Sequence, residues 1–294
     1  MPKISVFGGG AWGMALHFAL KEKNSAFIVS RKSLHLCAQI TQQEAQNSDF
    51  FVVAIPSFAL HSWLSTNPLP QNSKILVASK GIANGQFVSE IFEDFYPREN
   101  LSYLAGPSFA KEVRNSLPCA LNIHSYALDS AKIWAERFPS FIKTYTSLDV
   151  IGGEIGGAYK NVIAIASGIC EGLGLGNNAR SSLVARGLVE MTRFGKFFGA
   201  QDSTFLGLSG AGDLFLTANS TLSRNFRVGL YLAQGKSLEN ILETLGEVAE
   251  GVKTSEEIYT LALKHQIHTP IAKEVTHILK GKNPKQSLLD LMKN

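Results

Sequence analysis

Ile4–Gly13 reads ISVFGGGAWG, a short apolar strand that runs directly into a glycine-rich turn. Gly8, Gly10 and Gly13 occupy the three glycine positions of a GxGxxG pattern, and a helical stretch to about Lys21 follows. In this pattern the first glycine permits a tight turn, the second lets the backbone approach a pyrophosphate, and the third allows close helix–strand packing. A strand, a turn and a helix in this order predict a dinucleotide-binding fold.

Further apolar stretches continue the alternation of strands and helices. Strands are expected at Ala26–Ser30, Phe50–Ile55, Lys74–Ser79, Tyr103–Ala105, Cys119–Ile123 and Phe141–Tyr145. Two of these stretches, at 50–55 and 74–79, are almost wholly apolar, as in a parallel sheet that is covered on both faces. Ligands of open α/β sheets bind at the carboxyl ends of the strands. Lys80 and Ser108 follow strands and are therefore site candidates, although a plain loop lysine would also explain Lys80.

Beyond residue 150 the strand pattern gives way to helices. They are expected at Ile155–Glu171, Asn178–Phe198, Leu222–Ala233, Leu238–Leu245, Thr254–His265 and Pro270–Lys280. Glycines suited to the position just past a helix end stand at Gly199, Gly235 and Gly281. The sequence thus predicts an α/β protein. A Rossmann-type dinucleotide-binding domain of residues 1–150 is followed by an all-α substrate domain of residues 151–294.

Lys160 occurs where an ordinary solubilising lysine would be out of place. The stretch Gly152–Asn161 reads GGEIGGAYKN and leads into the apolar run Val162–Ile169. Apolar residues recur at three- and four-residue spacing, which predicts a mostly buried helix from Ile155 onward. Burial would lower the pKa of a lysine towards neutrality and suit it to acid/base chemistry. The structural alternative is a lysine that snorkels to the surface.

Two polar motifs lie in the helical half. Leu208–Leu214 reads LSGAGDL, and Ser223-Arg224-Asn225 precedes a helical run. Ser223 is a natural N-cap, and Arg224 with the N–H groups of the first turn is suited to hold a phosphate. Taken singly, the two residues are also explained by helix capping and by an ordinary surface arginine.

Composition narrows the classes of function. The 294 residues are 45% apolar and 18% charged, which describes a globular protein with sizeable cores. A net charge of +4 suits a small anionic substrate, whereas no basic run argues for nucleic acid.

Cys37, Cys119 and Cys170 form no CxxC pair, and the histidines form no HExxH motif. We therefore expect reduced thiols in a cytoplasmic protein, with no metal site. No signal peptide or membrane-spanning run is expected. We also expect a homodimer, although no residue pattern fixes the oligomeric state.

A series of motifs occurs in one order along the chain. It comprises GGGAWG at Gly8–Gly13, Lys80-Gly81-Ile82, GPSFA at Gly106–Ala110 with Glu112, Gly153–Asn161, Gly212-Asp213-Leu214, Ser223-Arg224-Asn225 and Glu250-Gly251. This series closely resembles the bacterial NAD(P)-dependent glycerol-3-phosphate dehydrogenases, over nearly the whole chain. The GPSFA, AYKN and SRN elements are the most specific part of the resemblance.

The resemblance implies a reaction and the residues that carry it. The reaction is reversible hydride transfer between a nicotinamide and carbon 2 of glycerol 3-phosphate, with dihydroxyacetone phosphate as the ketone. It would supply glycerol 3-phosphate for phospholipids. Lys160 is then the proton acceptor or donor at the substrate hydroxyl. Substrate contacts carry over to Lys80, Gly106, Ser108, Asp213, Ser223, Arg224 and Asn225. In addition to the glycines of the turn, cofactor contacts carry over to Trp12, Arg31, Lys80, Ala110, Arg224, Val248 and Glu250.

Arg31 bears on the choice of cofactor. The second strand ends in Ser30-Arg31-Lys32, where an NAD enzyme usually places an acid for the ribose 2′-hydroxyl. A guanidinium grips a 2′-phosphate, or stacks on the adenine of either cofactor. NADP(H) is therefore favoured, and NAD(H) stays open. The segment between Arg31 and Phe50 is shorter than in most of the family, so cofactor contacts there transfer least well.

Two other classes of protein share part of this pattern. A β-hydroxyacid dehydrogenase of the same fold would usually carry an asparagine four residues after its lysine, where this chain has Ala164. A non-catalytic NADP(H)-sensing protein would need the glycine turn but not Lys80, Lys160 and Arg224 together. Tyr159 stands where many family members have leucine and is expected only to fill apolar space.

Overall fold

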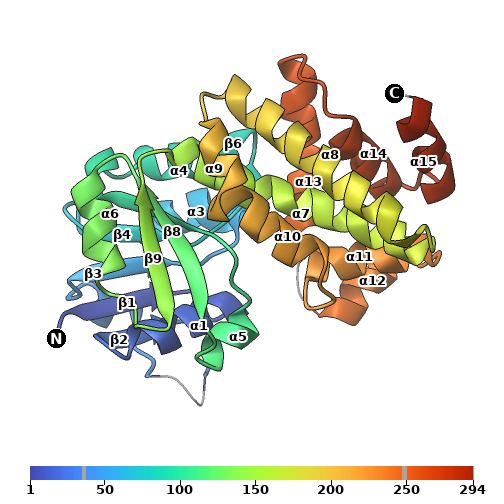
Figure 1. The fold of residues 1–294 in the computed structure, drawn as a ribbon. Coiled ribbons are helices and arrows are strands. Elements are labelled where there is room, and N and C mark those ends of the chain that lie inside the picture. The colour runs from blue at the N-terminus through green and yellow to red at the C-terminus, as the bar shows by residue number, and fades with distance from the viewer. Residues whose placement is uncertain (35–37, 247–249, 294) are drawn as a thin grey trace. The chain divides into compact units, whose positions relative to one another are not determined.

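The computed structural model describes residues 1–34, 38–246 and 250–293, and Figure 1 shows its elements. The chain forms two compact units. Unit 1 comprises Met1–Lys80 and Gln86–Glu154, and unit 2 comprises Gly81–Gly85 and Ile155–Asn294. The boundary falls within one helix, α7 (Val150–Gly172), whose first turn belongs to unit 1.

A seven-stranded sheet forms the centre of unit 1. Its strands are β1 (Lys3–Phe7), β2 (Ser25–Val29), β3 (Phe50–Val53), β4 (Lys74–Val77), β7 (Leu101–Ala105), β8 (Cys119–Ser125) and β9 (Ile142–Ser147). They lie in the order β2-β1-β3-β4-β7-β8-β9, and all neighbours are parallel except β7 and β8. The chain leaves β1 for β2 on one side and returns to β3 on the other. A topological switch point, where ligands of such sheets bind, therefore lies at the carboxyl end of β1.

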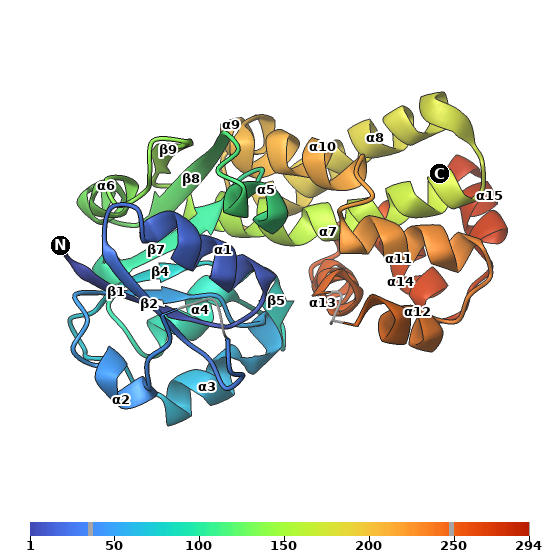
Figure 2. The ribbon, with the colours of Figure 1, turned by 90° about the horizontal axis from the view of Figure 1, so that it is seen from below.

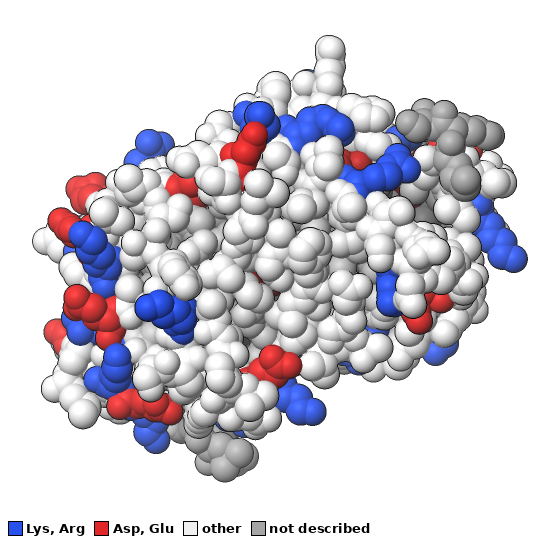
Figure 3. Space-filling view, in the orientation of Figure 1, with Lys and Arg blue, Asp and Glu red and all other residues white. Residues whose placement is uncertain are grey.

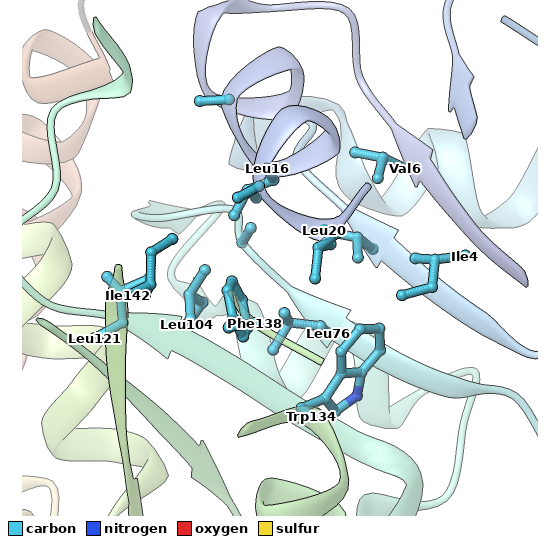
Figure 4. Packing of buried hydrophobic residues seen from close by; sticks show 14 of the residues in the cluster. Ile4, Val6, Leu16, Leu20, Leu76, Leu104, Leu121, Trp134, Phe138 and Ile142 are labelled. Carbon is cyan, nitrogen blue, oxygen red and sulfur yellow. The ribbon is translucent and has the colours of Figure 1, made fainter. Parts of the chain in front are cut away.

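Helices cover both faces of this sheet. In unit 1 they are α1 (Ala11–Leu20), α2 (Gln42–Ala45), α3 (Leu60–Thr66), α4 (Val88–Glu93), α5 (Ala110–Arg114) and α6 (Leu128–Ala135), with single 3₁₀ turns at Ser57–Ala59 and Arg98–Asn100. Figure 2 shows α1 and α5 on one side of the sheet and α3 on the other. On the first side, Ile4 and Val6 join Leu16 of α1 in one apolar core (Figure 4). On the other side, the rings of Phe7 and Trp63 lie 5.1 Å apart. Successive residues of β1 thus serve opposite faces, as a doubly covered parallel strand requires.

Among the described residues of unit 2, the regular elements are helices apart from the two-residue strand β5 (Ile82–Ala83); its neighbour in sequence, β6 (Gln86–Phe87), belongs to unit 1. After α7 come α8 (Gly176–Phe197), α9 (Asp202–Leu206), the π-helical turn η3 (Leu208–Gly212), α10 (Asp213–Ala218), α11 (Arg224–Ala233), α12 (Leu238–Leu245), α13 (Glu250–Lys264), α14 (Pro270–Leu279) and α15 (Pro284–Lys293). Helix α7 is central to unit 2, since each residue from 155 to 170 is buried. The predicted fold class, a Rossmann-type sheet followed by a helical half, is confirmed.

The start of α7 differs from the prediction. The helix begins at Val150 rather than at Ile155 and runs through its own glycines. Asp149 accounts for this start, because its Oδ1 accepts a hydrogen bond from the backbone N–H of Gly152 at 3.0 Å. A carboxylate in this position satisfies one of the N–H groups that the first turn leaves without a partner.

Other helix boundaries agree more closely with the sequence pattern. The predicted ends are confirmed, because Gly199, Gly235 and Gly281 each follow a helix with φ of 89°, 85° and 103°. The pattern does not predict α9, α10, α15 or η3. No helix within the described ranges is both long and apolar enough to cross a membrane. Cys119 and Cys170 are free thiols, and Cys37 lies outside the described residues.

Candidate functional site

The glycine-rich turn lies at the switch point of the sheet in unit 1. Gly8 adopts a φ of 120°, and a Cβ there would lie 2.3 Å from the carbonyl oxygen of Ala54, just after β3. A Cβ on Gly13 would lie 1.9 Å from the carbonyl oxygen of Gly8. Neither position has room for a side chain. Gly8 therefore makes the tight turn, and Gly13 the close packing, that the GxGxxG pattern predicts.

Gly10 differs from these two glycines because the space around it is open. It is the N-cap residue of α1, and a Cβ there would meet no other atom within 4 Å. The first N–H groups of a helix have no partner within it and favour a phosphate. The turn therefore fits the pyrophosphate of a dinucleotide. Trp12 on α1 and Ala110 at the start of α5 both pack against the apolar core below this turn.

The end of β2 lies against the same turn. A Cβ on Gly9 would lie 2.3 Å from Oγ of Ser30 and 3.1 Å from Cδ1 of Leu34. A side chain on Gly9, a position that GxGxxG leaves open, would therefore displace the side chains of Ser30 and Leu34. Arg31 and Lys32 are exposed in this segment. The Arg31 guanidinium makes no hydrogen bond or ion pair with any residue that the structure describes, so it is available to a ligand.

Two more loops follow strands at the same edge of the sheet. The backbone N–H of Ala78 donates to the carbonyl of Val53 at 2.8 Å, which ties the segment before Lys80 to β3. Gly106 follows β7 with a φ of 116°, and Ser108 Oγ donates to its carbonyl at 3.2 Å. Lys80, Gly106 and Ser108 thus lie in loops at the carboxyl ends of β4 and β7, where ligands bind in this fold.

Lys160 of unit 2 is buried and paired. Its Nζ donates to Oδ1 of Asp213, the first residue of α10, at 2.5 Å. The two side chains are only 11% and 1% exposed. Thr217 Oγ1 donates to the carbonyl of Asp213 at 2.6 Å and holds the same turn. The alternative of a lysine that snorkels to the surface is therefore wrong. The carboxylate favours the charged ammonium whereas burial disfavours it, and the pair is held away from bulk water.

Close contact between two helices fixes the start of α11. Ser223 is its N-cap as predicted, since its Oγ accepts from the backbone N–H of Phe226 at 3.2 Å. A Cβ on Gly168 of α7 would lie 1.9 Å from the carbonyl oxygen of Phe226. A Cβ on Gly229 of α11 would lie equally close, 1.9 Å, to a carbonyl oxygen of α7. These glycines let the backbones touch, and they place Arg224, the first residue of α11, relative to the helix of the catalytic candidate.

The start of α13 joins the same group of helices. Asn225 Oδ1 accepts from the backbone N–H of Gly251 at 3.2 Å. A Cβ on Gly251 would lie 2.5 Å from that oxygen and 3.2 Å from Cβ of Asn161, so a larger residue would displace the Asn225 side chain. Glu250 is the first residue of α13. Val248, a predicted cofactor contact, lies outside the described residues.

The structure thus gathers the predicted residues into two sets. In unit 1, the Gly8–Gly13 turn, Arg31 and the two strand-end loops share one edge of the sheet. In unit 2, Lys160, Asp213 and the 223–225 segment share packed helices. Sequence reasoning missed Thr217 and Gly9 as parts of these sets. Thr217 bonds the backbone of its own helix, as threonines in many helices do, and Gly9 is at a variable position of the motif, so neither residue is marked by the sequence pattern.

Charged side chains do not concentrate at one place on the face shown in Figure 3. There Lys and Arg alternate with Asp and Glu, without a continuous area of either sign among the side chains described. Such a face lacks the basic stripe that binds a nucleic-acid backbone. No cluster of three or more His, Cys, Asp or Glu residues suited to a metal ion occurs within the described part of the chain.

Comparison with known proteins agrees with this arrangement. Residues 149–290 match the family described as NAD-dependent glycerol-3-phosphate dehydrogenase C-terminus, and residues 31–131 match its N-terminus counterpart. A glycerol-3-phosphate dehydrogenase [NAD(P)+] of Wolinella succinogenes is 62% identical over 291 residues, which cover 98% of each chain. One of Helicobacter hepaticus is 54% identical and covers 99% of this chain and 100% of its own. The crystal structure of the glycerol-3-phosphate dehydrogenase of Coxiella burnetii superimposes with a TM-score of 0.92 at 29% identity, over 100% of this chain and 99% of that one.

These matches span both units and confirm the family that the motifs predict. They also agree with the predicted use of NAD(P), since the names of both relatives include this cofactor. The chain belongs to the NAD(P)-dependent glycerol-3-phosphate dehydrogenase family.

Proposed function

We propose that this protein catalyses the reversible, NAD(P)-dependent interconversion of sn-glycerol 3-phosphate and dihydroxyacetone phosphate. In this proposal unit 1 holds the dinucleotide at the Gly8–Gly13 turn, and unit 2 holds the phosphorylated substrate. The observation that carries the proposal is the buried pair of Lys160 and Asp213, on helices that also position the start of α11. Membership of the family supports the same reaction.

Lys160 donates and accepts the proton in this proposal. A bound nicotinamide would deliver hydride to carbon 2 of the ketone, or accept it from the alcohol. As the ketone is reduced, negative charge develops on its oxygen, and Lys160 neutralises that charge by donating its proton. Asp213 holds the ammonium group in its charged form and in one orientation before the transfer. In the oxidative direction the neutral amine of Lys160 takes the proton of the substrate hydroxyl.

In this proposal the start of α11 binds the phosphate of the substrate. Arg224 supplies a full positive charge, and the N–H groups of the first turn supply donors and the positive end of the helix dipole. Ser223 fixes this turn as its cap, and Gly251 holds the side chain of Asn225. We propose the strand-end loops with Lys80, Gly106 and Ser108 as further substrate contacts. Trp12, Ala110, Val248 and Glu250 remain proposed cofactor contacts.

The proposal also covers cofactor preference, cellular location and oligomeric state. Arg31 at the end of β2 supports a preference for NADP(H) over NAD(H), because no acid replaces it there. The free thiols of Cys119 and Cys170 suit a reducing cytoplasm. Supply of glycerol 3-phosphate to phospholipids follows from the reaction, and a homodimer remains a prediction.

A direct assay tests the proposal. Purified protein is mixed with NADPH or NADH and dihydroxyacetone phosphate, and the absorbance of the reduced nicotinamide is followed. Parallel reactions contain unphosphorylated dihydroxyacetone, or a short β-hydroxyacid with the oxidised cofactor. Rapid oxidation only with the phosphorylated ketone supports the proposal. Turnover of the β-hydroxyacid instead would favour the related dehydrogenase. Cofactor binding without turnover of any substrate would favour a sensing protein.

A further inference from the structure

One side chain, Gln39, organises the segment that carries Arg31. Its Nε2 donates to the carbonyl oxygens of Ser30 at 2.8 Å and of Lys32 at 3.0 Å. Its Oε1 accepts from the backbone N–H of Leu34 at 3.0 Å. The two carbonyls that Gln39 binds are those on either side of Arg31. A single amide group thus holds the backbone of both residues that flank the arginine.

The sheet in turn anchors Gln39. The backbone N–H of Ile28 in β2 donates to the carbonyl of Ala38 at 2.9 Å, and that of Ile40 donates to the carbonyl of Ile28 at 3.0 Å. These bonds form an isolated parallel bridge between Ile28 and Gln39. The backbone of Gln39 is therefore fixed to the edge strand, and its side chain reaches the loop from a rigid base.

A second contact confines the segment from the other side. Ser30 Oγ and Leu34 Cδ1 lie where a side chain on Gly9 would be, so the loop packs directly on the phosphate-binding turn. Ser30 Oγ also accepts from the backbone N–H of Lys32 at 3.1 Å. Between these contacts the side chain of Arg31 is exposed, as are those of Lys32 and Ser33. Because the backbone on both sides of Arg31 is already held, binding has to order only the arginine side chain and not the loop as well.

We infer that Gln39 is a positioning residue for cofactor selection, which acts by holding Arg31 towards the 2′-phosphate of NADP(H). Gln39 itself does not contact the cofactor. The inference rests on the proposed function for the assignment of the Gly8–Gly13 turn to a nicotinamide dinucleotide.

Binding measurements test the inference without any need for turnover. Dissociation constants of NADP+ and NAD+ are measured by titration calorimetry for the native protein, Gln39→Met, Arg31→Ala and the double variant. Methionine keeps the length of the side chain and removes the three hydrogen bonds. Gln46→Met is the matched control, because Gln46 is a surface glutamine of the same unit whose Nε2 donates to the carbonyl of Pro68 at 2.9 Å. Thermal unfolding of each variant is recorded in parallel.

We expect the native protein to bind NADP+ more tightly than NAD+. Gln39→Met should reduce this preference about fivefold, almost wholly through weaker NADP+ binding, the scale of one or two lost hydrogen bonds. Gln46→Met should leave the preference unchanged. In the Arg31→Ala background, Gln39→Met should cause no further reduction, because Gln39 acts through the arginine.

Three results would overturn the inference. The first is a native protein without a preference for NADP+, the second is equal weakening of both cofactors by Gln39→Met, and the third is an additive effect of the two substitutions on the preference. The proposed function fails in a different way, through absence of dihydroxyacetone phosphate reduction. A protein that binds NADP+ as expected but does not reduce this ketone would refute the reaction and leave the role of Gln39 intact.

Discussion

Nζ of Lys160 lies 2.5 Å from Oδ1 of Asp213, and the two residues come from different helices, α7 and α10. Both side chains are almost excluded from water. Each charge therefore depends on the other, and removal of one partner of such a buried pair typically costs ~3–5 kcal/mol of stability. A test of the chemical role of Lys160 has to separate proton transfer from this loss of stability.

Lys160→Ala should reduce turnover of dihydroxyacetone phosphate by at least ~100-fold, the usual scale of a lost general acid/base. Binding of NADP+ should remain nearly unchanged, because the dinucleotide turn lies in unit 1. The measurement is kcat at saturating substrate on protein whose circular dichroism shows it to be folded.

The double variant Lys160→Ala with Asp213→Asn is the control for stability. The amide carries no charge, so the double variant should unfold at a higher temperature than Lys160→Ala while turnover stays low. Recovery of turnover together with stability would assign the first loss to folding. A fall of less than roughly tenfold in Lys160→Ala would also remove Lys160 as the acid/base.

The turn and the order of elements were predictable because their signals are local. Gly8 and Gly13 belong to a motif whose spacing predicts a tight turn between a strand and a helix. Glycines such as Gly199 mark helix ends. The start of α7 was not predictable from propensity, since four glycines precede Lys160. Tertiary packing overrides propensity there: Gly153 lies against the ring of His124, and Gly156 lies against the carbonyl of Ser209.

Pairings between distant segments could not be predicted. Asp213 is recognisable as part of a motif, but its partnership with Lys160 exists only once α7 and α10 pack. Tyr159 shows the same limit. Its hydroxyl donates to the buried carboxylate of Glu190 at 2.8 Å, and Glu190 also accepts the backbone N–H groups of Ile271 and Ala272 at the start of α14. The expectation that Tyr159 only fills apolar space is therefore wrong.

Arg224→Ala should weaken recognition of the substrate phosphate. Loss of a charge-assisted bond predicts a fall of about 10- to 100-fold in kcat/KM for dihydroxyacetone phosphate. Unphosphorylated dihydroxyacetone should be a poor substrate of the native protein and should lose much less. Arg186→Ala, at an exposed position on α8, serves as the control. Equal losses for both ketones would assign Arg224 to folding or to cofactor binding.

Glu154 makes the stability of unit 1 depend on pH. Its carboxylate accepts from the backbone N–H of Ser89 at 2.7 Å and from Ser89 Oγ at 2.5 Å, in the first turn of α4. Burial raises the pKa of Glu154 from 4.5 to about 8, against the effect of these hydrogen bonds. Between these two values the folded chain binds more protons than the unfolded chain. The contribution of protonated Glu154 to the free energy of unfolding is therefore lost as the pH rises from 4.5 towards 8.

Glu154→Gln should remove this dependence while it keeps an acceptor for Ser89. The free energy of unfolding of the native protein, relative to the variant, should fall between pH 5 and 8, by at most ~1.4 kcal/mol per pH unit. The comparison with the variant matters, because burial lowers the pKa of His124 to about 4 and makes stability rise with pH below 6.5. Urea unfolding at several pH values measures the difference, with Glu256→Gln, at an exposed glutamate of α13, as the control. A native-to-variant difference that stays constant with pH would contradict the prediction.

Gly168→Ala should separate positioning of the substrate site from binding of the cofactor. The added Cβ would lie 1.9 Å from the carbonyl oxygen of Phe226, and a backbone atom cannot yield as a side chain can. Helix α11 must therefore move away from α7, which displaces Arg224 and costs about 1–3 kcal/mol of stability. We expect a raised KM for dihydroxyacetone phosphate and an almost unchanged dissociation constant for NADP+. Gly187→Ala is the matched control on α8, because the three atoms nearest to its Cβ all belong to the side chain of Ile163, from 2.8 Å. This overlap is with a buried side chain of α7 and not with the backbone of α11, so Gly187→Ala should lose stability while its KM stays near the native value. A loss of stability in Gly168→Ala without any change in KM would mean that the contact between α7 and α11 supports the fold alone.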